Sequence, residues 1–407
     1  MKKVYVVAAK RTAIGKFLGT MANLNPIDLA VPVVKQILID TKIDPSKIDE
    51  VIIGNVLMAG HGQGIARQIS IKSGIPQEVP AYGINMICGS GMKSIMQGLN
   101  NIVAGQAEVV LAGGTESMSN ANYVIPGATM RNGAKMGDFK VIDHLVYDGL
   151  TDAFTGLHMG ITAENVAERY NITRQEQDNF AYNSQQKAIA AVDNGNFKEE
   201  IVPVIIPNKK GDIVFDTDEY PNRTTTFDKL STLKPVFKKD GTVTAGNASG
   251  INDGASFVLI ASEEAVNKYG LTPLVEIIGI GQGGVAPDVM GLGPVPAIQN
   301  ALAIAKEFIP DIKLTDIEVL ELNEAFAAQS LGVMKLLCEE HKVTNEWLSE
   351  RTNKNGGAIA LGHPIGASGN RIVVSLLHEM KRSNNKLGLA SLCIGGGMGA
   401  CTIYRNV

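Results

Sequence analysis

The sequence predicts an α/β fold built from two similar halves. Strand-like runs rich in β-branched residues, at 4–9 and 51–56, alternate with a stretch at 27–39 whose apolar residues recur at helical spacing. This alternation is typical of α/β proteins. The order recurs later in the chain, where E-V-L-E-L-N ending at Asn323 resembles E-V-I-I-G-N ending at Asn55. The recurrence indicates an internal duplication.

Each half also contains a turn of small residues that opens a helix. In the first half, residues 88–91 (C-G-S-G) precede an apolar stripe over residues 92–103. In the second half, residues 363–369 (H-P-I-G-A-S-G) precede a similar stripe over residues 372–380. A strand follows each helix and ends in glycines: Gly113 and Gly114 in one half, Gly395, Gly396 and Gly397 in the other. We expect the two halves to pack with these turns facing each other.

Between the halves lies a segment rich in Asn, Thr, Asp and Gly, with a helix expected near residues 161–194. We interpret it as an inserted, ligand-binding region. The chain then divides into a first half (residues 1–118 and 251–272), an inserted loop domain (119–250) and a second half (273–407).

Composition excludes several classes of protein. The 407 residues are 45% hydrophobic and 19% charged, with a net charge of −4, so the chain can bury a large core and has no basic excess for nucleic acid. No apolar run approaches the length of a membrane span, and the first apolar run ends at Lys10. Four cysteines without a C-x-x-C pair favour a reducing compartment, which we expect to be the cytoplasm.

Cys88 is the first candidate catalytic residue. At the start of a helix, unpaired N–H groups and the helix dipole lower a thiol pKa and favour the reactive thiolate. The alternative is a buried structural cysteine, but the glycines after Cys88 would let a substrate approach the backbone. His363, in the second glycine turn, is the candidate base, although a loop histidine is often simply solvated.

Three further residues are candidates in the second half. Cys393 precedes Gly395 in a turn after a strand, where glycine amides are suited to an oxyanion hole. Asn323 ends a strand and is suited to hold a water molecule or a carbonyl group.

Cys338 and His341 are spaced like metal ligands, but no second pair lies near, so we expect a helix interior and no metal.

One glycine motif is rejected. The G-x-G-x-x-G pattern at residues 279–284 is followed by Pro287 and Asp288 where a helix should continue, so we expect no dinucleotide site.

Taken together, four motifs resemble the thiolase family: N-M-I-C-G-S-G-M-K around Cys88, N-E-A-F-A-A-Q from Asn323, G-H-P-I-G-A-S-G around His363, and C-I-G-G-G-M-G from Cys393. The likeness extends over nearly the whole chain and includes A-G-G-T-E-S-M-S and T-A-G-N-A-S-G. It implies a five-layered αβαβα fold. His158-Met159-Gly160 resembles the short-chain acetyl-CoA acetyltransferase branch.

The resemblance implies ping-pong catalysis of acetoacetyl-CoA formation and its reversal. Cys88 would attack acetyl-CoA with help from His363, and the amides of Cys88 and Gly395 would stabilise the oxyanion. CoA would leave, and a second acetyl-CoA would bind with its carbonyl polarised by His363 and an Asn323-held water. Cys393 would remove the α-proton. Coenzyme A is then substrate and product, and no cofactor is expected.

The resemblance also implies substrate contacts and an assembly. Ser249 would contact the pantetheine, Arg223 lies near the adenine-end motif but one position later than in relatives, and the chain would form a homotetramer, a dimer of dimers. The segment 336–353, longer than in relatives, is expected to be a surface elaboration. The residues implied in the pantetheine tunnel and the acyl pocket are His158, Met159, Met290 and Phe326.

Three alternatives remain open from the sequence. A degradative 3-ketoacyl-CoA thiolase of broader chain length differs mainly in loop shape. A decarboxylating ketosynthase would lack a proton-abstracting cysteine such as Cys393, and a non-catalytic acyl-CoA-binding protein would not need all of these residues. We also hypothesise that oxidation joins Cys88 to Cys393 and switches the enzyme off.

Overall fold

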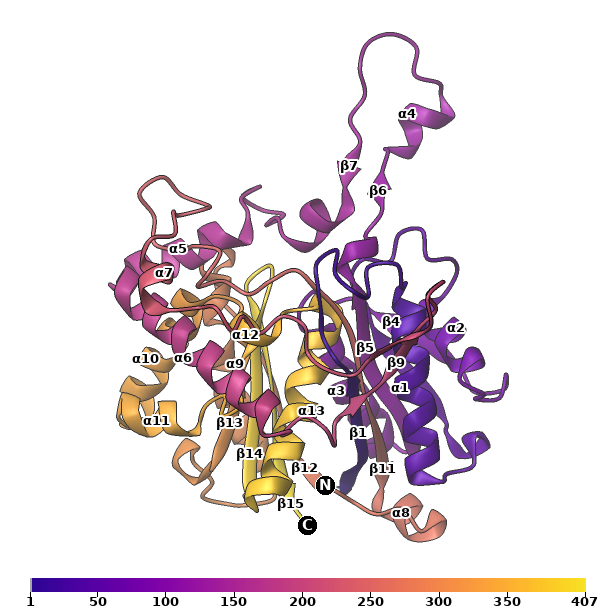
Figure 1. Cartoon of the computed structure of the whole chain (residues 1–407). Helices are drawn as coiled ribbons and strands as arrows, with labels where there is room; N and C mark the ends of the chain where they lie inside the picture. Colours follow the sequence, from indigo (N-terminus) through magenta and orange to yellow (C-terminus); the bar gives the residue numbers. More distant parts are fainter. Residues whose placement is uncertain (1) are drawn as a thin grey trace.

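The computed structural model describes residues 2–407 and shows a continuous mixed β-sheet with helices on its faces (Figure 1). The first-half strands are β1 (Val4–Thr12), β3 (Glu50–Gly54), β4 (Ala81–Ile84), β5 (Val109–Ser117) and β11 (Asn252–Ser262). The second-half strands are β12 (Val275–Gly284), β13 (Val319–Leu322), β14 (Leu387–Ile394) and β15 (Met398–Asn406). Two short strands pair at the sides: β2 (Gly15–Lys16) with β11, and β8 (Ile201–Val202) with β1.

The strand order repeats between the halves. The first half runs β1-β11-β5-β3 and the second runs β12-β15-β14-β13. Directions repeat as well: in each half the first two pairings are antiparallel and the third is parallel. The halves meet where β1 pairs with β12 through Tyr5–Glu276 and Val6–Val275. The predicted fold of two similar halves is confirmed.

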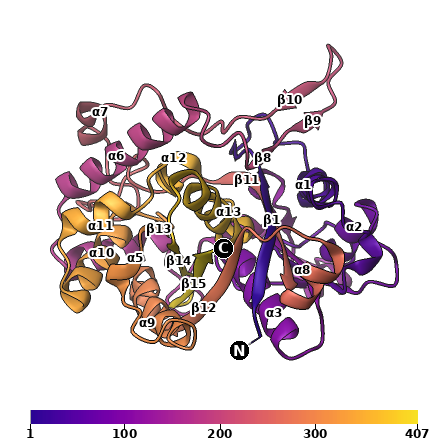
Figure 2. The same ribbon diagram turned by 90° about the horizontal axis from the view of Figure 1, so that it is seen from below.

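Helices cover both outer faces and fill the space between the halves. Outside the first half lie α1 (Pro26–Thr41) and α2 (Ile65–Lys72), and outside the second lie α9 (Pro294–Ala305) and α10 (Ala327–His341). Between the halves, α3 (Ser90–Val103) packs against α13 (Ile365–Ser383) (Figure 2).

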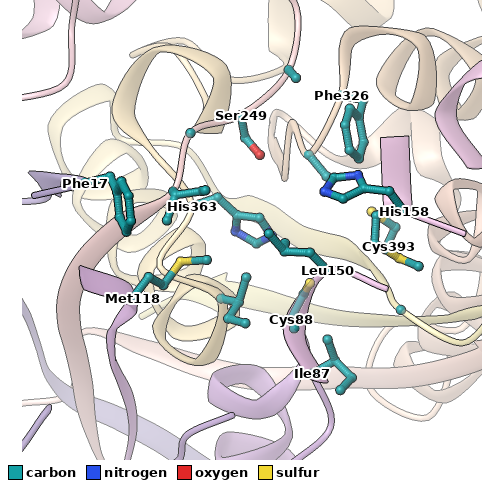
Figure 3. A pocket seen from close by; sticks show the side chains of 18 of the residues that line it. Phe17, Ile87, Cys88, Met118, Leu150, His158, Ser249, Phe326, His363 and Cys393 are labelled. Atoms are coloured by element: carbon teal, nitrogen blue, oxygen red, sulfur yellow. The ribbon is translucent and has the colours of Figure 1, made fainter. Parts of the chain in front are cut away.

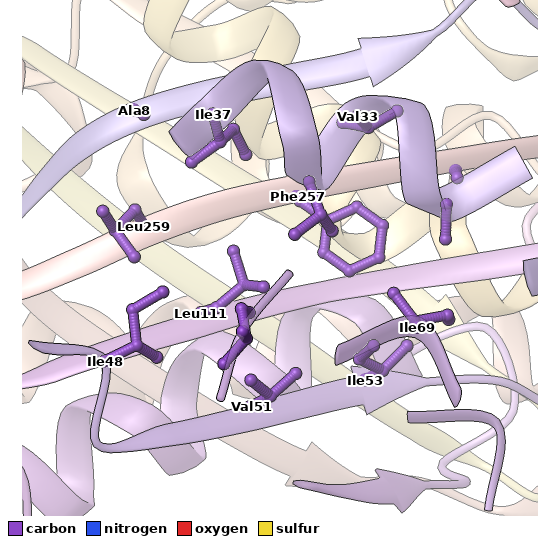
Figure 4. Close-up of a cluster of buried hydrophobic side chains, with 14 of the residues drawn as sticks. Ala8, Val33, Ile37, Ile48, Val51, Ile53, Ile69, Leu111, Phe257 and Leu259 are labelled. Atoms are coloured by element: carbon purple, nitrogen blue, oxygen red, sulfur yellow. The ribbon is translucent and has the colours of Figure 1, made fainter. Parts of the chain in front are cut away.

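Side-chain alternation along the strands produces these layers. In β5, Val109 and Leu111 join the outer apolar cluster with α1 (Figure 4), whereas Val110 and Ala112 join the inner cluster with α3 and α13. Because both faces of the sheet are covered, the strands are apolar on both sides. The layers follow the expected order α, β, α, β, α.

The glycine motif at residues 279–284 lies inside strand β12, so it is not a strand-to-helix turn. Its glycines let α9 approach the sheet closely: a Cβ at Gly281 would lie 2.2 Å from the carbonyl oxygen of Ala297. The motif therefore has a packing role.

The stretch near residues 161–194, where one helix was expected, forms two helices. Helix α5 (Met159–Arg169) ends before Asn171, whose φ of 52° breaks the helix, and α6 (Arg174–Asp193) starts at a Thr173 capping box. An arm projects from the body in Figure 1, and a hairpin projects beyond α1 in Figure 2. The arm contains β6 (Tyr123–Val124), α4 (Gly127–Arg131) and β7 (Ile142–Asp143); the hairpin is β9 (Val204–Ile206) with β10 (Ile213–Phe215).

The longer segment 336–353 is not only a surface elaboration, contrary to expectation. It ends α10 and forms α11 (Asn345–Arg351), and Leu337 and Leu348 are fully buried in the second-half core. The remaining helical elements are η1 (Pro45–Lys47), η2 (Met118–Asn120), η3 (Leu145–Gly149), α7 (Phe227–Ser231), α8 (Glu263–Tyr269), η4 (Pro287–Leu292), η5 (Leu314–Asp316) and α12 (Ala358–Leu361).

The first and last strands, β1 and β15, both pair with β12. Val275 of β12 pairs with Val6 near one end and with Asn406 near the other. Among residues 2–407, no helix combines the length and the apolar character needed to cross a bilayer.

Candidate active site

Most of the predicted site residues line one cavity of about 520 Å³ between the two halves and the inserted segment (Figure 3). The cavity wall is largely apolar, which suits a substrate whose reacting part must be kept from water. The predicted residues that line it are Cys88, His158, Met159, Ser249, Met290, Phe326, His363, Cys393 and Gly395.

Cys88 lies in a tight turn just before α3. Ser90 fixes this turn, because its Oγ accepts from the Met86 amide at 2.9 Å and donates to the Ile87 carbonyl at 2.6 Å. Burial raises the pKa of the Cys88 thiol to about 11, while hydrogen bonds from the backbone of Gly395 and of Cys88 itself lower it. The expectation that the helix start lowers the pKa of Cys88 is therefore wrong, because the effect of removing the thiol from water outweighs the effect of the helix. Cys88 needs a base to become a nucleophile.

His363 is positioned to be that base. It lies between α12 and α13, buried, and its own amide donates to Asn252 Oδ1 at 2.9 Å. The Ser368 hydroxyl lies 2.6 Å from His363 Nδ1 and donates to the Pro364 carbonyl, so we assign the ring proton to Nδ1, which donates to Ser368 Oγ. Nε2 has no hydrogen-bond partner among residues 2–407. Nε2 then carries a lone pair that can accept a proton.

Two effects keep His363 neutral. Burial, and then the nearby positive charge of Arg371, lower the pKa of His363 to about 3. A neutral imidazole is the form that accepts a proton from a thiol. The protonation state therefore permits the predicted role, while the two shifted pKa values make proton transfer from the Cys88 thiol to His363 energetically uphill.

Asn323 lies behind the histidine and is not among the residues that line the cavity. Its Nδ2 is 3.5 Å from His363 Nδ1, and its Oδ1 accepts from Arg371 Nη2 at 3.4 Å. Arg371 in turn lies 3.5 Å from Glu321, with both side chains buried. The predicted role of Asn323 in holding a water molecule stays a prediction.

Cys393 lies within β14 rather than in the turn after it, and only 1% of it is exposed. Burial raises the pKa of its thiol, and the charge of a Cys88 thiolate raises it further. Gly395 follows the strand and lines the same cavity as both sulfurs. Both cysteines therefore rest as thiols around one substrate space.

Part of the cavity wall is aromatic and lies beside Cys393 (Figure 3). The His158 ring stacks on Phe237 with centroids 4.6 Å apart, and Phe237 meets Phe326 edge-on at 6.2 Å. His158 Nδ1 also accepts from the Gly160 amide at 3.0 Å and so caps α5. Gly160 is required here, because a Cβ at this position would lie 2.2 Å from Phe237.

A second, more polar cavity of about 580 Å³ adjoins the first, and Lys16, Tyr220 and Ala245 line both. Arg223 lines neither cavity; it is exposed and donates to Asp193 at 3.0 Å. The structure therefore does not bring Arg223 to the site.

Several contacting residues escaped sequence reasoning. Phe237 and Arg371 carry no motif signal of their own, because their contacts depend on how separate elements pack. Ser368 stood in the quoted motif around His363 without a role. The Glu of A-G-G-T-E-S-M-S, Glu116, stood in a quoted motif without a role.

An α/β fold of two duplicated halves, with two cysteines and a histidine around one cavity, defines a class of acyl-transferring enzymes. Family models agree: the thiolase N-terminal domain matches residues 4–264, and the thiolase C-terminal domain matches residues 271–406. The chain belongs to the thiolase family and is an acyltransferase.

Individual relatives cover the whole chain. An acetyl-CoA acetyltransferase of Cupriavidus necator is 52% identical over 98% of both chains. The structure of an acetyl-CoA acetyltransferase from Syntrophomonas wolfei superposes with a TM-score of 0.96 at 42% identity and covers 100% of both chains. That of human mitochondrial 3-ketoacyl-CoA thiolase in complex with CoA has a TM-score of 0.91 at 44% identity, covering 100% of this chain and 98% of that one.

Proposed function

We propose that this chain is an acetyl-CoA acetyltransferase that joins two acetyl-CoA molecules into acetoacetyl-CoA and CoA and also catalyses the reverse cleavage. The observation that carries the proposal is the placement of two cysteine thiols and a neutral histidine in one cavity. Relatives that share about 50% of their residues with this chain are named acetyl-CoA acetyltransferase, which supports acetyl-CoA and acetoacetyl-CoA as the substrates.

The first half-reaction is acetyl transfer to Cys88. His363 Nε2 takes the proton of the Cys88 thiol, and the thiolate sulfur bonds to the carbonyl carbon of acetyl-CoA. The amides of Cys88 and Gly395 stabilise the resulting oxyanion. The bond to the CoA sulfur then breaks, the leaving sulfur takes up a proton, and acetyl-Cys88 remains.

The second half-reaction needs Cys393 because Cys88 is then occupied by the acetyl group. The Cys393 thiol gives its proton to the leaving CoA sulfur, and the thiolate so formed removes an α-proton from the second acetyl-CoA. The carbanion attacks acetyl-Cys88, and the Cys88 sulfur leaves and takes back its proton from His363 Nε2. Until then, the protonated His363 and an Asn323-held water polarise the second carbonyl. These steps use only protein groups, one water molecule and CoA thioesters.

The two adjoining cavities support binding of a whole CoA molecule. The apolar cavity would hold the acyl group and pantetheine beside Ser249, His158 and Met159, with Met290 and Phe326 limiting the acyl space. The polar cavity would hold the nucleotide, with Lys16 and Lys229 in its wall for the phosphates. Arg223 is not needed in this arrangement.

We propose a homotetramer in the cytoplasm. The arm carries exposed apolar side chains that a second copy would cover: Tyr123, Met130, Met136, Phe139 and Val141. Reduced thiols support the compartment, since no two cysteines within residues 2–407 form a disulfide.

The test compares CoA-dependent cleavage of acetoacetyl-CoA with cleavage of a medium-chain 3-ketoacyl-CoA, with Cys88→Ala as control. We expect the short substrate to be cleaved much faster and the Cys88→Ala variant to be inactive, because it lacks the sulfur that carries the acyl group. Equal or faster cleavage of the longer substrate would assign the chain to the degradative class. Cleavage of neither would refute the catalytic proposal.

A further inference from the structure

Glu116 is a buried carboxylate that the mechanism above does not use. It lies near the end of β5 and has no exposed surface. Its Oε1 accepts from Asn55 Nδ2 at 2.8 Å and from the Leu57 amide at 3.1 Å. Its Oε2 accepts from the Val56 amide at 3.0 Å and from the Gly366 amide at 2.9 Å. Every partner is a donor, and these hydrogen bonds favour the ionised form, whereas burial raises the pKa of Glu116 to about 7.

These contacts join the two halves beside the reacting groups. Val56 and Leu57 form, with Ile365, an apolar cluster against which Cys88 packs. Gly366 lies in the first turn of α13, three residues after His363. One carboxylate thus holds the turn that supports Cys88 and the start of the helix that follows His363.

The contact between Glu116 and Gly366 is tightly packed. A Cβ at Gly366 would lie 2.4 Å from Glu116 Oε2, and a Cβ at Gly114 would lie 2.1 Å from the Gly366 carbonyl oxygen. The loops therefore approach as closely as glycine permits, and a shift of the carboxylate would move the start of α13.

The internal duplication gives Glu116 a counterpart. In the first half Gly114 pairs with Gly54, just before Asn55; in the second half Ser391 pairs with Leu322, just before Asn323. Two residues further along each strand stand Glu116 and Cys393. Glu116 therefore occupies in the first half the position that Cys393 occupies in the second.

We infer that Glu116 is a positioning residue that sets the separation between the Cys88 sulfur and His363 Nε2. This inference rests on the proposed function for its catalytic readout. Proton transfer from Cys88 requires the two groups to be within hydrogen-bonding reach, and a displacement of about 1 Å costs on the order of 100-fold in rate.

The test is Glu116→Gln, which keeps the shape of the side chain. In this variant an NH₂ group replaces one carboxylate oxygen and faces backbone N–H donors that bond to that oxygen in the wild-type protein. The matched control is Glu379→Gln at the other end of α13, where a buried carboxylate accepts from Asn355 Nδ2 at 2.8 Å and from Ser383 Oγ at 2.6 Å. Thermal unfolding is measured for both. Catalysis is followed as kcat and KM for acetoacetyl-CoA cleavage, and Cys88 reactivity as its alkylation rate by iodoacetamide, read by peptide mass spectrometry.

We expect Glu116→Gln to lower kcat about 100-fold with KM for CoA changed less than about three-fold. The negative charge of Glu116 raises the pKa of the Cys88 thiol, so loss of the charge alone would speed alkylation of Cys88. We expect the displacement of His363 to outweigh this effect and to slow alkylation about ten-fold. Glu379→Gln should keep both rates whatever its Tm. An unchanged kcat in Glu116→Gln, or equal losses in the two variants, would overturn the inference.

Two further outcomes remain decisive. If the wild-type protein does not cleave acetoacetyl-CoA, the proposed function fails, but the alkylation rates still test the positioning of Cys88. If Glu116→Gln does not fold, Gly366→Ala perturbs the same contact from the other side. Alkylation of Cys88 at the wild-type rate in Gly366→Ala would then overturn the inference.

Discussion

At the scale of single residues, the site is built from groups that burial holds in their uncharged forms. Cys88 and Cys393 have raised pKa values and His363 has a lowered one, and burial is the first cause of each shift. Proton transfer from sulfur to Nε2 creates an ion pair that did not exist before. The backbone amides are therefore most useful after this transfer, when negative charge has developed.

The lowered pKa of His363 predicts an acid-sensitive fold. The unfolded chain binds a proton at this residue below about pH 6.5, whereas the folded chain binds it only near pH 3. Because the unfolded state binds more protons in this window, the free energy of unfolding falls by about 1.4 kcal/mol per pH unit as the pH drops through it. Above the window, His363 contributes no pH dependence.

Urea unfolding between about pH 7 and pH 4.5 measures this dependence. The variant His363→Gln should lose stability less steeply than the wild-type protein as the pH falls. Equal slopes for the two proteins would show that His363 titrates normally in the folded state.

At the scale of elements, close packing of α9 on β12 depends on glycine. We expect Gly281→Ala to lower the free energy of unfolding by about 1–3 kcal/mol, because the added methyl group would lie 2.2 Å from the Ala297 carbonyl oxygen. Gly284→Ala in the same strand is the control, since its methyl group would meet nothing closer than 3.9 Å. Urea unfolding of both variants decides the point, and equal losses would contradict it.

Elements and motifs were readable from the sequence because they depend on local patterns. Apolar spacing and glycine turns predict the helices α3 and α13 and the strands β3 and β13, which end just before Asn55 and Asn323. The thiolase motifs then identified the cavity residues.

The sequence could not show what depends on distant packing. The pKa of Cys88 is set by burial in the assembled halves, which outweighs its place before a helix. The contact of Glu116 with Gly366 requires one half to pack on the other, and the contacts of Arg371 require α13 to pack on β13. Arg223 carries a charge that its motif suggested for CoA, but it pairs with Asp193 on α6 instead.

At the scale of the whole molecule, a buried ion network ties the first strand to the inserted segment. Arg11 in β1 donates to Asp218 at 2.7 and 2.9 Å and to Glu200 at 2.6 Å, and all three side chains are buried. We expect Arg11→Leu to cost about 3–5 kcal/mol of unfolding free energy, because it leaves two buried carboxylates without their cationic partner.

The matched control for Arg11 is an exposed ion pair. Lys238→Leu breaks the contact with Glu168, and we expect little change in its urea midpoint. Similar midpoints for Arg11→Leu and Lys238→Leu would contradict the importance of the buried network.

The arm offers a test of assembly. Val124 pairs with Ile142, so residues 125–141 can be replaced by an Asn-Gly turn without opening the ladder. We expect sedimentation equilibrium to show a tetramer for the full chain and a smaller assembly for the shortened one, because the exposed apolar side chains of the arm are gone. An identical mass for the two chains would contradict the proposed role of the arm.

The neighbouring chain ends make this fold suitable for circular permutation. Because Val6 and Asn406 both pair with Val275, a short flexible linker can join the last strand to the first. New ends can then be opened at the tip of the β9–β10 hairpin, where residues 208–211 are exposed. In such a chain the second half would precede residues 1–118 of the first half during synthesis, while Cys88, His363 and Cys393 would keep their places. The order in which the ribosome makes the two halves is thus separable from the chemistry that they perform together.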